Sequence, residues 1–169
     1  TKPEACIGEN NEMLMIYRSN TPKGLRLGIA KAEDLNSPFK RISEEPVFHF
    51  DEKRFCEDPF VWWNGNQYEV IMKDLTGNIT GEWHSGVHGY SKDALNWKIA
   101  DQPQAYSRSV IWENGDTTMQ GSFERPQLLF DENENPSHLF AATADGPGGF
   151  RNATKTWCMV IPLKTEIDE

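Results

Sequence analysis

The sequence has few cysteines, no long apolar run and no excess of positive charge. The three cysteines, Cys6, Cys56 and Cys158, lack metal-site spacing, so we expect buried free thiols and neither a metal nor another cofactor. No apolar run approaches the ~18 residues that a membrane span needs. A net charge of −9 argues against a partner bound through its phosphates. The sequence therefore predicts no nucleic-acid partner and no membrane partner.

Long helices are also not indicated. No stretch sustains a 3.6-residue period, and 13 glycines and 10 prolines interrupt the chain. The segments 61–63 and 68–72 instead read as strands on either side of "NGNQ", in which Asn64-Gly65 is a strong hairpin signal. Aromatic residues make up 11% of the chain, which suits both packed β-sheets and surfaces that stack on sugars. We predict an all-β chain.

A repeat runs along the sequence. The segment "GIAKAEDLNSPFKRI" (28–42) aligns with "GVHGYSKDALNWKIA" (86–100), and Pro3, Pro59 and Pro126 open successive units. Units of this size with about four strands each predict propeller blades, which are four-stranded antiparallel sheets. We expect one partial propeller domain, residues 1–169, with blades 1–50, 51–105 and 106–169.

Acidic residues stand directly before the proline-led strands, in "RFCEDPFVWW" (54–63) and "SFERPQLLF" (122–130). The first strand of a propeller blade lies innermost, so Glu57, Asp58, Glu124 and Arg125 would converge on one axial pocket. Proline is tolerated at the first residue of a strand, which fits this placement. We take Asp58 and Glu124 to occupy equivalent positions. The alternative is that these acids only form turns.

The motifs "EDPFVWW", "SFERPQ" and "SGVHGYSKDALNW" resemble the five-bladed propeller glycosidases of glycoside hydrolase family 43 and its relatives. This resemblance implies about three of five blades and a hydrolase of oligo- or polysaccharides acting in carbohydrate metabolism. It also implies a periplasmic or secreted location, Glu124 as general acid, and Asp58 as the aspartate that tunes and orients that acid. The alternative function is a non-catalytic carbohydrate-binding propeller or an inactive fragment.

Two features depart from the family pattern. The aspartate that would act as general base opens an earlier blade, and no residue of this chain is assigned to it. Arg125 stands where the family usually has a small residue, and a cation there favours the ionised form of Glu124, unless Glu57 or Asp58 neutralises it. We expect the carboxylates of Asp58 and Glu124 to lie within about 10 Å of each other, as paired glycosidase acids do.

Several further residues are candidates for contacts with a carbohydrate. We predict substrate-binding roles for Glu57, Arg125, Trp83 and His88. Trp83 would stack on a sugar from a rim loop, whereas His84 and His88 could equally be hydrogen-bonded structural residues. The "ADGPGGF" segment (144–150) is interpreted as a plain connection that could border the pocket. The pair Lys73-Asp74 is interpreted as an exposed ion pair or as a contact to a sugar hydroxyl.

Three blades cannot close a ring, since propellers have ~4–8 of them. Large apolar side chains would then be left bare on the outer blade faces, and an unpaired strand near Val160 would offer an edge. The candidates for these faces are Phe55, Phe60, Trp63, Phe123 and Leu129. Besides its carbohydrate substrate, we therefore expect the chain to bind a missing N-terminal segment of the same protein or a second copy of itself.

Overall fold

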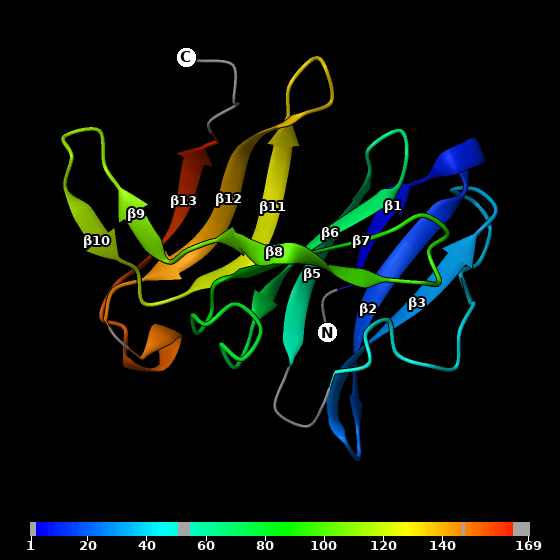
Figure 1. Cartoon of the computed structure of the whole chain (residues 1–169), viewed down its shortest axis with the longest axis horizontal. Helices are drawn as coiled ribbons and strands as arrows, with labels where there is room; N and C mark the ends of the chain where they lie inside the picture. Colours follow the sequence, from blue (N-terminus) through cyan, green and yellow to red (C-terminus); the bar gives the residue numbers. More distant parts are fainter. Residues whose placement is uncertain (1–2, 51–54, 147, 164–169) are drawn as a thin grey trace.

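The computed structural model describes residues 3–50, 55–146 and 148–163. Three antiparallel sheets lie side by side, with the second between the first and the third (Figure 1). The helical content of these residues is two short 3₁₀ helices, Glu9–Asn11 and Gly149–Asn152. No helix in this part of the chain has the length and apolar character to cross a membrane.

The first and second sheets each have four strands in sequential order. The first sheet consists of β1 (Glu4–Ile7), β2 (Met13–Thr21), β3 (Gly24–Ala32) and β4 (Lys40–Arg41). The second consists of β5 (Cys56–Trp63), β6 (Tyr68–Asp74), β7 (Gly86–Ser91) and β8 (Lys98–Tyr106). The prediction of an all-β chain built from four-stranded antiparallel sheets like those of propeller blades is thus confirmed.

The third part of the chain differs from the first two. A separate hairpin, β9 (Ser109–Ile111) with β10 (Thr117–Met119), precedes the last sheet. That sheet shows three strands in the described residues: β11 (Phe123–Phe130), β12 (Pro136–Ala144) and β13 (Thr156–Pro162). No described strand pairs with the outer edge of β13, where Val160 lies.

Local turn chemistry explains how these strands are connected. The β5–β6 hairpin forms at Asn64-Gly65 as predicted: Gly65 has a φ of +87°, and the Asn64 side-chain oxygen accepts hydrogen bonds from the backbone N–H groups of Asn66 and Gln67. Backbone with positive φ suits glycine, because glycine has no Cβ to clash.

The repeat found in the sequence corresponds to a repeated turn after the third strand. After β3, the Asp34 carboxylate accepts hydrogen bonds from the backbone N–H groups of Asn36 and Ser37. After β7, the Asp93 carboxylate accepts equivalent bonds from Leu95 and Asn96. An aspartate that holds its own turn in this way is typical of an Asx turn. The matched sequence segments therefore fold alike.

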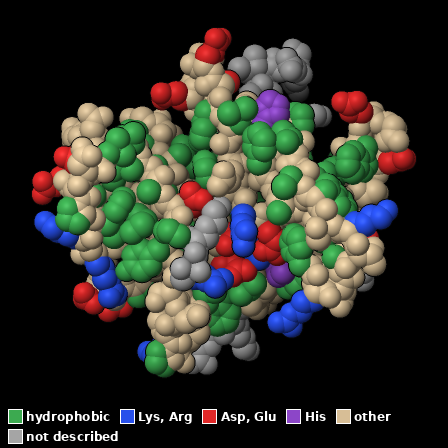
Figure 2. Space-filling model, turned by 180° about the vertical axis from the view of Figure 1, so that it is seen from behind, with side chains coloured by type: hydrophobic (Ala, Val, Ile, Leu, Met, Phe, Trp, Pro, Cys, Tyr) green, Lys and Arg blue, Asp and Glu red, His purple; other side chains and the backbone are tan. Residues whose placement is uncertain are grey.

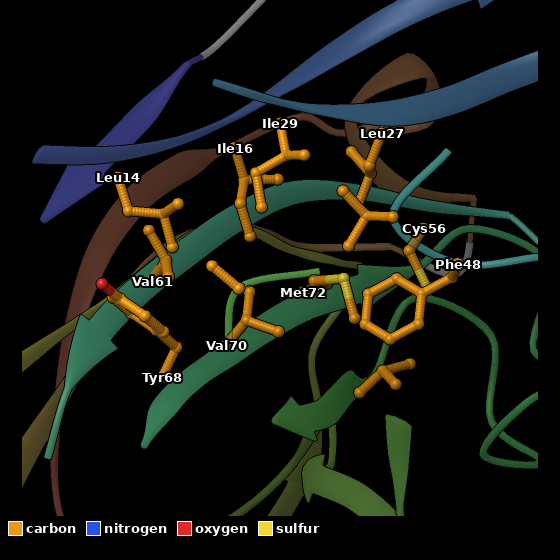
Figure 3. Close-up of a cluster of buried hydrophobic side chains, with 13 residues drawn as sticks. Leu14, Ile16, Leu27, Ile29, Phe48, Cys56, Val61, Tyr68, Val70 and Met72 are labelled. Carbon is orange, nitrogen blue, oxygen red and sulfur yellow. The ribbon is translucent and has the colours of Figure 1, made fainter. Parts of the chain in front are cut away.

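The main core lies between the first and second sheets. Side chains from β2 and β3 point towards side chains from β5 and β6 (Figure 3), and the most deeply buried of them are Leu14, Ile16, Val70 and Met72. Burial of each such side chain stabilises the fold by roughly 1.5–3 kcal/mol. This packing holds β5 firmly in place, and β5 carries the acids of the "EDP" motif.

The third sheet leaves apolar side chains exposed on one face. Leu129 of β11, Phe140 of β12 and Val160 of β13 are all exposed. Phe123 was predicted to lie on such a bare face, but this was wrong: it is fully buried against Val110, because β11 packs on the β9–β10 hairpin through that side. What covers the exposed face, a segment of the same protein or a second copy, remains a prediction.

Candidate functional site

Two matching β-bulges build the site. The register of β5 against β6 shifts between Glu57 and Phe60, and that of β11 against β12 shifts between Glu124 and Gln127. At each bulge the residue before the proline has a left-handed backbone, with a φ of 52° at Asp58 and 54° at Arg125. Bulges re-aim side chains, and non-glycine residues with positive φ are concentrated at functional sites.

The bulges also change the assumed equivalence between the two acidic motifs. The residue that corresponds to Glu124 is Glu57, and the residue that corresponds to Asp58 is Arg125, because both pairs stand at the same place relative to the bulge. The two bulges touch, since the Arg125 backbone N–H donates to the Asp58 carboxylate at 3.3 Å. The sequence alignment matched the acids by charge and so missed this shift of one residue.

The acids nevertheless come together. Carboxylate oxygens of Glu57, Asp58 and Glu124 lie within 4.8 Å of one another. This separation is well inside the distance of about 10 Å expected for Asp58 and Glu124. The cluster forms because β5 and β11 are adjacent first strands of neighbouring sheets.

Lys73 links the carboxylates of the two sheets. It lies directly across from Glu57 in the β5–β6 pairing, and its ammonium contacts the Glu57 carboxylate at 2.6 Å. The same ammonium forms an ion pair with Glu124, whose own cross-strand partner is the small residue Ala142. The Lys73 side chain is only 2% exposed, so its interpretation as an exposed ion pair was wrong. Its carboxylate partners come from neighbouring strands and not from Asp74.

Asp74 has a separate role beside the site. Its fully buried carboxylate accepts hydrogen bonds from backbone N–H groups at Gly77, Ile79 and Thr80. These bonds hold the loop between β6 and β7, which leads to Trp83. A buried charge must be compensated by hydrogen bonds, and here the loop backbone supplies them.

A hydrogen-bonded chain joins His84 to Glu124 through Ser122. The Ser122 hydroxyl donates to the Glu124 carboxylate, so it accepts from His84 Nδ1–H at 2.8 Å. Burial, followed by the nearby Lys73 ammonium, lowers the pKa of His84 to about 4. The imidazole is therefore neutral at pH 7 and carries its proton on Nδ1.

The environment of Glu57 acts in two directions. Burial alone would raise the pKa of Glu57, but hydrogen bonds and charge attraction from Lys73 and Arg18 outweigh it and hold that pKa below its usual value. The Arg18 guanidinium contacts the second carboxylate oxygen at 2.6 Å. Glu57 is therefore an ionised residue fixed from both sides.

The low pKa of His84 predicts how stability depends on pH. The unfolded state binds a proton at this histidine near pH 6.5, whereas the folded state does so only near pH 4. Stability should therefore fall as the pH drops from 6.5 towards 4. We expect His84→Gln to remove about 1 kcal/mol of the loss measured by urea unfolding between pH 7 and pH 5. An unchanged pH dependence in this variant would contradict the assignment.

The acids open into a cavity of about 740 Å³. Its wall also includes Trp83, Phe150 and Arg151. Figure 2, which views the side away from β8, shows acidic and basic side chains gathered at the middle of the face, between hydrophobic areas. An apolar wall with a few converging polar groups is typical of a ligand site.

The aromatic wall of the cavity is held rigidly. Trp83 stacks on His84 with a centroid distance of 3.4 Å, and the Arg108 guanidinium lies 5.2 Å from the centroid of its ring. Gly149 approaches Trp83 closely, with a φ of +66°, and an added Cβ would lie 3.3 Å from the indole. The "ADGPGGF" segment thus borders the cavity, and its interpretation as a plain connection was wrong.

The predicted residues do not all meet. Glu57, Glu124, Arg125 and Trp83 line the cavity, and Asp58 contributes to its carboxylate cluster. His88 does not line it. The His88 ring is 2.7 Å from the Glu69 carboxylate and faces a different, smaller cavity of about 250 Å³. The cause is strand alternation, which directs neighbouring residues of β7 to opposite sides of the sheet.

Sequence reasoning missed several residues of the site, namely Lys73 as the link between the acids, Ser122, Phe150 and Arg151. One signal was available for Lys73: counted back across the "NGNQ" hairpin, it falls opposite Glu57. Ser122 stands two residues before Glu124, which places both on one side of an extended strand. No local pattern marks Phe150 or Arg151.

The three carboxylates could in principle bind a metal ion, since hard cations prefer carboxylate oxygens. The site does not fit this role well, because the Lys73 ammonium already contacts Glu57 and Glu124. The cluster is therefore better described as a charge-paired acidic site.

Comparison with solved structures finds several similar folds. A structure described as "Glycoside hydrolase" and a complex of BT0996 described with the term "RGII" each align with a TM-score of 0.63 at 15% identity, over 97% and 98% of this chain respectively. Sucrose-6-phosphate hydrolase from Lactobacillus gasseri aligns with a TM-score of 0.53 at 19% identity, over 82% of this chain and 28% of its own. This chain spans 46% of the length of each of the first two.

No protein-family model matches the sequence, and no curated protein sequence does so either. The structural likeness, at identities below 20%, establishes the fold. The chain has the propeller-like arrangement of antiparallel sheets that is found in glycoside hydrolases.

Proposed function

We propose that this chain forms part of a glycoside hydrolase whose cavity binds an oligo- or polysaccharide, of the family 43 type that its motifs resemble. One observation carries the proposal: carboxylates from the first strands of two neighbouring sheets lie within 4.8 Å of one another in a cavity walled by Trp83 and Phe150. Carboxylates supply acid and base groups for glycoside hydrolysis, and aromatic rings stack on sugar faces.

Within this proposal Glu124 is the general acid and Asp58 is the neighbour that tunes it. Two carboxylates that share a small site resist double ionisation, so Asp58 favours a proton on Glu124. Protonation would break the ion pair between Glu124 and Lys73, while the contact between Lys73 and Glu57 at 2.6 Å could be kept. Lys73 thus has an alternative partner when the acid takes up its proton.

The spacing also limits which roles these acids take together. In inverting glycosidases the acid and the base are about 6.5–9.5 Å apart, which leaves room for the attacking water. Glu57, Asp58 and Glu124 are closer than that. We therefore assign the cluster to the acid side of the reaction, and the base or nucleophile comes from residues other than these three.

A non-catalytic carbohydrate-binding propeller is the second candidate. The ion pairs of Lys73 with Glu57 and Glu124 favour it, because they occupy the carboxylates with a buried cation. Such a site would still present Trp83 and the charged groups to a sugar, but without transferring a proton.

Product analysis on the full-length protein separates the two functions. We expect incubation with a panel of oligosaccharides and aryl glycosides to release reducing sugar, and the double variant Glu57→Gln/Glu124→Gln to abolish this release. Binding without release, by wild type and variant alike, would instead support the non-catalytic propeller. Neither binding nor release across the panel would refute both.

A further inference from the structure

Two arginines of the cavity wall have no acidic partner among the described residues. Arg125 and Arg151 line the cavity, and neither guanidinium forms an ion pair with a carboxylate of residues 3–50, 55–146 or 148–163. The other charges of the wall are matched: Lys73 contacts both Glu57 and Glu124. Positive charge is therefore left over at this place in a chain whose net charge is −9.

The backbone fixes where both arginines lie. Arg125 stands at the left-handed position of the β11 bulge, and its backbone N–H donates to the Asp58 carboxylate. Arg151 lies in the 3₁₀ helix of the loop between β12 and β13. Asp145 closes that loop, since its carboxylate accepts from the backbone N–H groups of Thr154 and Lys155 at 2.8 and 2.7 Å. Neither arginine lies on a long, unsupported loop.

We propose that Arg125 and Arg151 bind an oxyanion carried by the carbohydrate, so that the ligand is an acidic sugar and not a neutral one. A guanidinium offers a planar fork of N–H donors that matches carboxylate, phosphate and sulfate groups. This inference rests on the proposed carbohydrate function and adds the class of ligand to it. The aromatic rings of Trp83 and Phe150 then contact the sugar ring while the arginines select its charge.

The overall negative charge does not oppose this assignment. It favours neutral or cationic ligands at long range, but salt screens such fields over about 8–10 Å. Inside the cavity the contacts are closer than that, and two guanidinium groups without carboxylate partners in the described part of the chain outweigh distant surface acids. The acidic surroundings would slow the approach of an anionic sugar at low salt without preventing its binding.

A glycan array probed with the full-length protein tests the proposal. The array would carry neutral oligosaccharides, uronic-acid oligosaccharides with carboxyl-reduced counterparts, and sulfated and phosphorylated sugars. We expect binding to concentrate on acidic glycans and to weaken about tenfold or more in Arg125→Gln and in Arg151→Gln. Arg41→Gln is the matched control, because Arg41 lies on β4 and pairs with Glu44.

Each outcome separates the two levels of the proposal. Binding to the uronic-acid glycans that is lost in their carboxyl-reduced counterparts would assign the oxyanion as a carboxylate. Preference for sulfated or phosphorylated sugars would assign it to that group instead. Equal binding of neutral and acidic glycans, or acidic binding unchanged in both arginine variants, would overturn this inference and leave carbohydrate binding standing. No binding to any glycan would refute the carbohydrate function itself.

Discussion

Replacing Lys73 by methionine is expected to lower the free energy of unfolding by about 3 kcal/mol. Methionine fills a similar volume, but Glu57 and Glu124 lose their shared cation. Their side chains are only 13% and 19% exposed, so solvent cannot fully replace the ammonium. Removing one partner of a buried ion pair leaves an uncompensated charge, which costs more than the pair itself contributes. Urea unfolding at pH 7 measures the change.

Two further variants show whether the loss comes from unpaired charge. Lys31→Met removes a comparable ion pair with Glu12, but both side chains are about a quarter or more exposed, so the loss should be below about 1 kcal/mol. Combining Lys73→Met with Glu57→Gln and Glu124→Gln removes the stranded charges and should restore part of the stability. If Lys73→Met costs no more than Lys31→Met, Lys73 does not hold the two sheets together.

Several features of the fold could be predicted because they depend on short-range chemistry. Asn64-Gly65 specifies its hairpin through a positive φ and side-chain hydrogen bonds to nearby backbone. Asp34 and Asp93 specify their turns in the same local way, so the repeat between them is visible in the letters. The convergence of the acids also followed from the repeat, since first strands of neighbouring sheets lie together.

The rest of the site depends on pairings that the sequence does not state. Whether Lys73 faces solvent or Glu124 is decided by how the second sheet packs on the third, and no local pattern encodes that packing. The bulges shift the register by one residue, so Glu57 takes the place assumed for Asp58. His88 was assigned to the site by residue type, yet strand alternation directs it towards Glu69.

If the full-length protein hydrolyses aryl glycosides, Glu124→Gln is expected to lower kcat by about 10²–10⁴-fold for substrates with poor leaving groups. Glutamine keeps the shape of the side chain but cannot supply the proton that the departing oxygen needs. Substrates with good leaving groups, such as dinitrophenyl glycosides, need little protonation and should keep most of their rate. Steady-state rates for a series of leaving groups measure this difference.

The pH dependence gives a second, independent readout of the same variant. A general acid must be protonated, so its titration produces the fall in rate on the alkaline side of the pH profile. Glu124→Gln should remove that fall along with the leaving-group sensitivity. Glu12→Gln serves as the matched control, because Glu12 pairs with Lys31 outside the cavity. An equal loss of rate for good and poor leaving groups would show that Glu124 positions the substrate or the strands and does not donate the proton.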